Sequence, residues 1–171
     1  VKVEYFDLPV ITTPPASQIV AAGGTATFSV TASNTVGSYQ WRKNGTNISG
    51  ATASALTLSN VQGTNAGTYD VIVANGAGPV DSADAVLKVS PTITSQPASS
   101  TNLPLTTATF TVVAAGQTPF SYQWRKNGAD LADGGNISGA ASATLTVSSV
   151  APDAAGSYSV VVTNAGGSAT S

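Results

Sequence analysis

Apolar and polar residues alternate with a period of two along much of the chain. Residues 26–30 interleave Ala, Phe and Val with Thr and Ser, and apolar side chains recur at every second position in 56–58 and 69–73. A period of two predicts strands with one buried face. Pairs such as Asn44-Gly45 separate these runs, as the turns of β-hairpins do. No stretch has the spacing of an amphipathic helix, so the predicted fold class is all-β, built of antiparallel β-sandwiches.

The pattern occurs twice, because the chain contains an internal repeat. The run SYQWRKNG stands at Ser38–Gly45 and again at Ser121–Gly128, and it includes both tryptophans. A repeat of roughly 80 residues has the size of a small domain and exceeds the unit of a solenoid. We therefore predict two tandem domains at 9–90 and 91–171, preceded by a separate strand-like segment at 1–8.

Several separated features of both repeats resemble the immunoglobulin superfamily. Each repeat has a tryptophan in the middle of a strand, followed by the runs NAGTYDV in the first copy and DAAGSYSV in the second. These features are similar to those of cysteine-free, I-set-like domains of bacterial surface and secreted proteins. The resemblance implies two tandem immunoglobulin-like sandwiches, each with a tryptophan at its centre and a tyrosine corner beside it.

The same resemblance implies the composition of each core. The positions that carry the family's disulfide are valines here, and they would fill the space beside the tryptophan by apolar contact. The expected core of the first domain is Trp41, Tyr69, Val30 and Val71, and that of the second is Trp124, Tyr158, Val112 and Val160.

Composition narrows the range of functions. Only 8% of the residues are charged, the net charge is −2, and the chain has neither cysteine nor histidine. The low charge argues against a nucleic-acid partner. The lack of cysteine excludes a thiolate metal site, and the lack of histidine removes the commonest general base. We therefore expect no cofactor and no enzymatic activity. The weak candidates for a metal site are Asp130 and Asp133, two acids in a Gly-rich loop that could bind calcium.

The two ends of the chain suggest that one strand is displaced. Residues 82–90 are predicted to form the last strand, G, of the first domain. Asn164 corresponds to Asn75, so the counterpart of this strand would begin at about residue 171. The second sandwich is accordingly predicted to lack its own G strand. Residues 1–7 alternate as a G strand should, with Val and Tyr between Lys and Glu.

One interpretation of the displaced strand is a subunit of an extracellular bacterial fibre. By donor-strand complementation, Val1, Val3, Tyr5 and Leu8 would enter an acceptor groove at Tyr158, Val160 and Val162 of the next copy. The partners would then be copies of the same chain in a head-to-tail polymer, with cell-surface or matrix glycans as further candidate partners. The expected location is extracellular or at the cell surface, with no membrane span.

The alternative is an excerpt of a larger secreted protein. In that case the domains would be spacer, adhesion or carbohydrate-binding accessory modules, and residues 1–8 would end a preceding domain. A sugar-binding platform needs several exposed aromatic rings, and the predicted cores leave only Tyr5, Phe6 and Phe120 for it.

Overall fold

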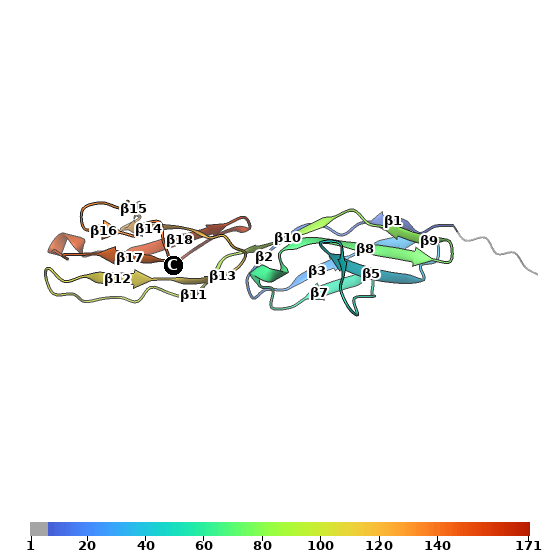
Figure 1. Cartoon of the computed structure of the whole chain (residues 1–171), viewed down its shortest axis with the longest axis horizontal. Helices are drawn as coiled ribbons and strands as arrows, with labels where there is room; N and C mark the ends of the chain where they lie inside the picture. The colour runs from blue at the N-terminus through green and yellow to red at the C-terminus, as the bar shows by residue number, and fades with distance from the viewer. Residues whose placement is uncertain (1–6) are drawn as a thin grey trace, which may run out of the picture. The chain divides into compact units, whose positions relative to one another are not determined.

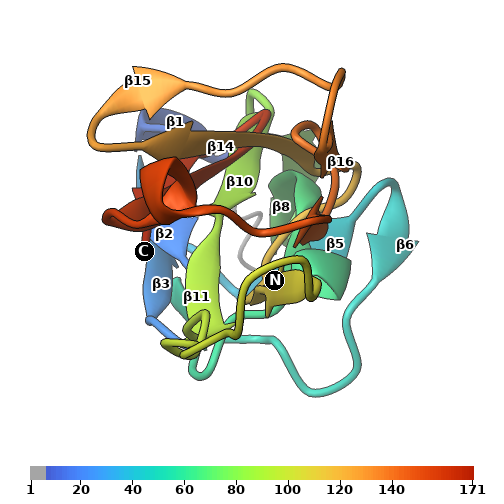
Figure 2. The ribbon, with the colours of Figure 1, turned by 90° about the vertical axis from the view of Figure 1, so that its left-hand side faces the viewer.

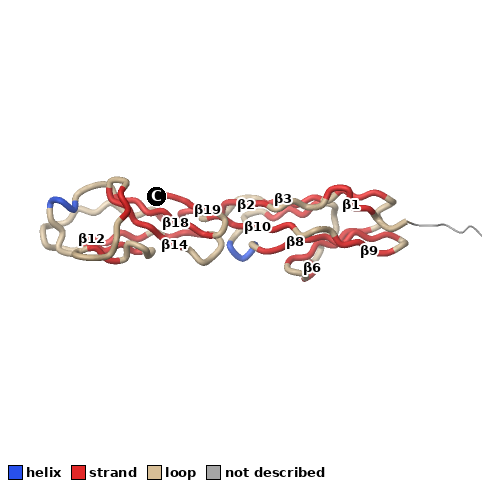
Figure 3. Tube along the Cα trace, turned by 90° about the horizontal axis from the view of Figure 1, so that it is seen from above, coloured by secondary structure: helices blue, strands red, loops and turns tan. Residues whose placement is uncertain are grey.

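The computed structural model describes residues 7–171, and its contacts divide the chain into two compact units between Lys88 and Val89. The sequence places this boundary two residues later, after Ser90. The regular structure of both units consists of strands joined by loops, with two short 3₁₀ turns, η1 (Gly63–Asn65) and η2 (Pro152–Ala154) (Figure 3). The all-β prediction is confirmed.

The first domain is a sandwich of two layers. Its strands are β1 (Val10–Thr13), β2 (Gln18–Ala21), β3 (Ala26–Ser29), β4 (Thr31–Ser33), β5 (Ser38–Lys43), β6 (Thr46–Asn47), β7 (Ala55–Leu58), β8 (Gly67–Asn75), β9 (Gly78–Asp81) and β10 (Ala85–Ser90). One layer has the order β2-β10-β8-β5-β6, with β9 also paired to β8, and the other contains the pairs β1-β4 and β3-β7 (Figures 1 and 2).

The second domain repeats this plan with fewer strands. Its strands are β11 (Thr92–Ser95), β12 (Ala108–Thr111), β13 (Val113–Ala115), β14 (Ser121–Lys126), β15 (Ala129–Asp130), β16 (Ile137–Ser138), β17 (Thr144–Val147), β18 (Tyr158–Asn164) and β19 (Gly167–Thr170). The sheet β15-β14-β18-β19 faces the pair β11-β13 and the three-stranded sheet β12-β17-β16. Nothing in the described part of this domain corresponds to β2 or β10.

The repeated run SYQWRKNG forms a strand and the turn that follows it in both domains. Asn44 and Gly45 have φ angles of 49° and 75°, which the two central positions of a type I′ turn require. The turn pairs β5 with β6 through Lys43 and Thr46. Asn127 and Gly128 do the same between β14 and β15.

Each core is centred on its tryptophan. Trp41 and Trp124 are fully buried, and each indole N–H donates to a backbone carbonyl, of Ala53 at 2.9 Å and of Ser142 at 2.8 Å. Among the other buried members common to the two cores are the valine pairs Val30 with Val71 and Val112 with Val160. The valines lie at the positions where the family resemblance would place a disulfide.

A tyrosine corner closes the end of both cores. The Tyr69 hydroxyl donates to the Asn65 carbonyl at 2.7 Å, and that of Tyr158 donates to the Ala154 carbonyl at 2.8 Å. Phe28 stacks on Tyr69 with ring centroids 4.8 Å apart. Because the acceptors are backbone carbonyls, the corner forms in both domains, although the accepting residue is asparagine in the first and alanine in the second.

We predict a loss of stability at alkaline pH from these tyrosines. Burial raises the pKa of Tyr69, and burial together with the charge of Asp153 raises the pKa of Tyr158. An unfolded tyrosine ionises near pH 10, so the stabilisation is complete below about pH 10 and is lost as the pH rises through the higher folded pKa. Urea titrations at a series of pH values should show this decline. Tyr69→Phe should weaken the alkaline loss of stability in the first domain. An unchanged loss in this variant would contradict its assignment to Tyr69.

The last strand of each domain differs from the predicted one. In the first domain it begins at Gly78, earlier than Ser82, and consists of β9 and β10 with a break at 82–84. In the second domain β19 pairs with β18 over Val161–Asn164, so the first part of a G strand is present. The prediction that this domain wholly lacks its G strand therefore needs correction. Pro79 and the glycine before it obscured the short first part in the sequence.

The turn before β12 holds a leucine in the left-handed region of the backbone. Leu105 has a φ of 67°, and the Thr106 N–H donates to the Leu103 carbonyl at 3.2 Å, as in a type II turn. The equivalent turn of the first domain has Gly23 at this position, with a φ of 88°. Leu105 is 81% exposed, so no packing of its side chain offsets the strain.

We expect Leu105→Gly to stabilise the second domain. Removing the left-handed leucine gains about 1–2 kcal/mol, and the greater entropy of glycine in the unfolded chain offsets about 0.5–1 kcal/mol of it. Leu105→Ala keeps the strain and should change little. The matched change Gly23→Ala meets no atom within 4 Å and should destabilise the first domain by strain alone. Chemical denaturation measures the stability of all three variants. A Leu105→Gly variant that is less stable than the parent chain would contradict the strain assigned to Leu105.

Candidate functional site

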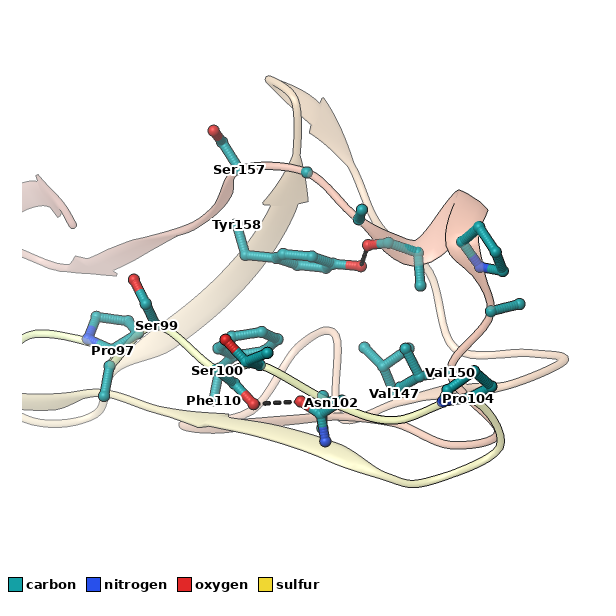
Figure 4. A pocket seen from close by; sticks show the side chains of 18 residues that line it. Pro97, Ser99, Ser100, Asn102, Pro104, Phe110, Val147, Val150, Ser157 and Tyr158 are labelled. Atoms are coloured by element: carbon teal, nitrogen blue, oxygen red, sulfur yellow. Dashed lines mark hydrogen bonds between the residues drawn. The ribbon is translucent and has the colours of Figure 1, made fainter.

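A groove of about 650 Å³ opens along one edge of the second domain. The rings of Phe110 and Tyr158 lie stacked on its floor with centroids 4.8 Å apart, and Val147 and Val150 continue the floor (Figure 4). The segment 97–102 forms one wall of the groove, and residues 154–158 form the other. The site is therefore a channel with an apolar floor and backbone along both sides.

Equivalent side chains are covered in the first domain. Phe28 and Tyr69 are 1% exposed there, and Val61 is fully buried. Their counterparts Phe110, Tyr158 and Val150 are only half-buried. The side chains match in type, so the difference comes from the strands that cover them.

The covering element in the first domain is β10. It pairs antiparallel with β8 through Ala85 opposite Tyr69 and Leu87 opposite Gly67, and it lies next to β2 on its other side (Figure 2). Ala85 and Leu87 are buried, whereas Val86 and Lys88 are exposed. The counterpart of β2 in the second domain, residues 100–103, forms no strand.

The predicted acceptor residues do not all line this groove. Tyr158 does, but Val160 and Val162 are fully buried under the sheet. The edge beside them is already paired within the chain, because Ser171 N–H donates to the Val160 carbonyl at 3.1 Å and Val160 N–H donates to the Ser171 hydroxyl at 2.9 Å.

The predicted assembly strand lies largely outside the described residues. Val1, Val3 and Tyr5 are in the part of the chain that the structure does not describe. Leu8 is half-exposed in the first domain, and its carbonyl accepts a hydrogen bond from the Asn34 amide at 3.1 Å.

Each of the two candidate calcium ligands has a partner within the protein. Arg125 donates to the Asp130 carboxylate at 2.6 Å, and Asp133 accepts a hydrogen bond from the Ala140 N–H at 2.7 Å. Within residues 7–171, no three acidic, His or Cys side chains lie together as a metal site would need. These contacts account for both acids as parts of the loop structure.

Sequence reasoning missed an ionic cluster on the first domain. Arg42 lies directly across the sheet from Asp70, donates to both of its carboxylate oxygens, and reaches Asp81 at 3.0 Å. The hydrogen bonds from Arg42 to Asp70 and then to Asp81 raise the arginine's pKa above its ordinary value. Only the strand register brings these residues together, and no local pattern in the sequence reports it.

Asn75 and Asn164 stand at equivalent positions of the two repeats. From the sequence they were recognised only as turn residues, and their side-chain contacts were not predicted. The Asn75 amide donates to the carbonyls of Asp7 at 2.7 Å and Asn34 at 2.8 Å. The Asn164 amide donates to the carbonyls of Val89 at 2.8 Å and Gln117 at 2.7 Å. In each domain this side chain ties the turn after the long strand to the segment by which the chain enters. Its recurrence at equivalent positions was the available signal.

No aromatic platform for sugar occurs among the residues that the structure describes. Phe120 is half-buried and meets Tyr122 edge-on, with ring centroids 6.4 Å apart. Tyr5 and Phe6, the other two candidates, lie outside the described residues.

Comparison with known proteins identifies the family. The profile described as "Immunoglobulin domain" matches residues 9–75 and 90–164. The chain belongs to the immunoglobulin-domain family. Both matches fall on the two sandwiches, so the fold predicted from the sequence is confirmed at the level of the family.

The chain is similar to a small part of an animal muscle protein. The muscle M-line assembly protein unc-89 of Caenorhabditis elegans is 32% identical over 187 aligned residues, which cover 99% of this chain and 2% of that protein. This chain thus spans only a small fraction of that relative's length. The bacterial source suggested by the resemblance is not shown by any of these relatives.

Solved structures show the same fold. The extracellular domains 3–5 of Drosophila OTK match 97% of this chain and 60% of their own, with a TM-score of 0.59 and 20% identity. The I-band fragment I67–I69 of titin matches 98% of this chain and 64% of its own, with a TM-score of 0.52 and 21% identity. At these identities the likeness concerns the fold alone.

The hypothesis of a bacterial fibre subunit is wrong. The relatives carry such immunoglobulin domains as parts of longer proteins. The structure agrees with this, because β19 and Ser171 of the same chain already pair with Val160–Asn164, the part of the β18 edge beside the predicted acceptor residues Val160 and Val162. The findings favour the alternative, in which the domains are modules of a larger protein.

Proposed function

We propose that the chain supplies two non-catalytic immunoglobulin-like modules that act as a spacer within a larger protein. The observation that carries this proposal is that each half of the chain matches the family and has a buried tryptophan core of its own. A module of this kind needs only to fold and to hold its neighbours apart.

The chemistry of the described surface supports a passive role. Asp70, Asp81 and Asp130 pair with arginine, and Asp133 accepts a backbone hydrogen bond. Catalysis needs a nucleophile with an activating base, a carboxylate pair in a cleft, or a metal. The floor of the groove instead presents aromatic and aliphatic side chains. Among the described residues, no helix is long and apolar enough to cross a membrane.

Sedimentation velocity over a wide concentration range tests the passive role. A spacer should sediment as a monomer with the chain mass of 16.8 kDa at all concentrations. Growth to larger species with concentration would show that the modules assemble among themselves, and the spacer role would then be rejected.

The proposal retains the extracellular or cell-surface location expected from the sequence. Antibody against the tandem should label intact cells that produce the larger protein. Labelling that appears only after the cells are permeabilised would contradict this part of the proposal.

A further inference from the structure

The five-residue sequence NISGA occurs once in each domain. It spans residues 47–51 and 136–140, and the stretches between it and the preceding Asn-Gly turn differ in length and in sequence. Its first three residues, Asn-Ile-Ser, have the form Asn-x-Ser/Thr of an acceptor for N-linked oligosaccharide, in which the middle residue is not proline. The repeat therefore places the same candidate modification site in both domains.

In the first domain this site lies on the outer strand of a sheet. Asn47 is the last residue of β6, which pairs with β5 at the end of the order β2-β10-β8-β5-β6 (Figure 2). Asn47 and Ser49 are exposed, and Ile48 between them is half-buried. The Ile48 N–H donates to the Trp41 carbonyl at 2.9 Å. The backbone is thus fixed to the core, while the acceptor amide and the serine hydroxyl are on the exposed side.

The second domain presents the same three residues at the edge of a different sheet. Asn136 directly precedes β16, the outer strand of the order β12-β17-β16, and its carbonyl accepts the Ser148 N–H at 2.8 Å. Asn136 and Ser138 are exposed, again with a half-buried isoleucine between them. Within residues 7–171, no hydrogen bond engages the side chain of Asn47 or of Asn136. Both side-chain amides are therefore available to receive a sugar.

A third sequence of this form, Asn-Gly-Thr at residues 44–46, provides an internal contrast. The Asn44 side-chain oxygen accepts the Thr68 N–H at 2.9 Å, which ties the turn after β5 to β8. A Cβ atom at Gly67 would lie 3.2 Å from the Asn44 amide nitrogen, so this nitrogen is close to the backbone of β8. A sugar on it would need the space beside Gly67 and would disturb the turn. The folded domain is therefore compatible with sugar at Asn47 and not at Asn44.

We propose that Asn47 and Asn136 carry N-linked oligosaccharides and that Asn44 does not. In the transfer, the asparagine amide nitrogen forms a bond to the anomeric carbon of an oligosaccharide that is carried on a lipid diphosphate. The bond from that carbon to the phosphate oxygen breaks, the lipid diphosphate leaves, and the amide proton passes to a base. Donor and transferase belong to the secretory pathway, so the inference rests on the extracellular location proposed above.

The sugars would cover two sheet edges that have little other protection. Edge strands expose unpaired backbone groups, and proteins commonly protect them with charged side chains, prolines or bulges. β6 consists of Thr46 and Asn47, and β16 of Ile137 and Ser138, so neither strand contains a charged residue or a proline. A bulky, solubilising sugar at each edge hinders pairing with the edge of another module. This protection suits a spacer that has to remain separate from its neighbours.

The test is to produce the 171-residue chain behind a cleavable signal peptide in animal cells. The mass of the processed chain, from the medium and from the cells, is measured before and after digestion with a peptide N-glycosidase. Two oligosaccharides per chain are expected. The digestion should convert Asn47 and Asn136, but not Asn44, to aspartate. A processed chain without N-linked sugar, or with aspartate at position 44, would overturn the proposal.

Substitutions at the hydroxyl residues remove one site at a time and leave every asparagine in place. Ser49→Ala and Ser138→Ala should each lose one oligosaccharide, whereas Ser49→Thr and Ser138→Thr should keep both. Thr46→Ala removes only the sequence at Asn44 and should also keep both. Loss of a sugar in Thr46→Ala, or two sugars in Ser49→Ala, would contradict the assignment. Either failure leaves the spacer role untouched, since that role is tested by the monomeric state of the unmodified chain.

Discussion

Replacing either core tryptophan by alanine is expected to destabilise its own domain by about 3–5 kcal/mol. Trp41 and Trp124 are fully buried, and their rings lie 6.2 Å from Phe28 and 6.3 Å from Phe110. Alanine leaves a cavity beside these aromatic rings, and it also leaves the carbonyl of Ala53 or of Ser142 without the indole donor. Small domains are stable by only about 5–15 kcal/mol, so the altered domain should be close to unfolding at physiological temperature.

The two tryptophans allow each domain to be followed separately. In Trp41→Ala the remaining fluorescence comes from Trp124, and its unfolding transition in urea should be unchanged. The first domain should meanwhile lose its transition as followed by circular dichroism. Trp41→Phe fills most of the space and should cost clearly less than alanine. A shift of the Trp124 transition in Trp41→Ala would show that the domains do not fold independently.

Asp70→Ala is expected to destabilise the first domain by about 2 kcal/mol. Asp70 is 7% exposed and accepts two hydrogen bonds from the Arg42 Nε atom, at 3.0 and 3.2 Å. Without this carboxylate the half-buried guanidinium loses its main partner. Breaking a buried pair costs about 3–5 kcal/mol, and an exposed pair about 0–1 kcal/mol. The remaining contact to Asp81 places this pair between the two limits.

The same cluster provides the controls. Asp81 has a side chain that is 59% exposed, so Asp81→Ala should cost less than about 0.5 kcal/mol. In the second domain Arg125 faces Ser159 across the sheet and pairs with the exposed Asp130, so Asp130→Ala should likewise change little. Urea denaturation compares the three variants. Equal costs for Asp70→Ala and Asp81→Ala would show that burial does not set the strength of the pair.

The features that were predictable from the sequence are local. Alternating apolar positions predicted β3 and β8. Asn44-Gly45 predicted the turn after β5, because the backbone angles of a type I′ turn favour these two residues. The early start of the last strand at Gly78 escaped prediction, since GPVD lacks the alternation of a strand. The pair Arg42–Asp70 depends on the register between two strands that are distant in the sequence.

The candidate site depended on tertiary structure in the same way. Aligning the two repeats placed Tyr158 beside an unfilled edge, and in the structure Tyr158 lines the groove. The alignment wrongly extended the open edge to Val160 and Val162, because the short β19 and the bonds of Ser171 were not visible as a pattern. Which side chains remain exposed was decided by the presence of β10 in one domain and not in the other.

The measurement that tests the central claim most directly is the forced extension of single molecules of the chain, held at its two ends. Two independently folded immunoglobulin-like modules should give two separate unfolding events. Each event should lengthen the chain by about 25–30 nm, the span of roughly 80 extended residues. One event of about twice that length would show that the chain is a single cooperative unit, and would contradict the account of two separate modules.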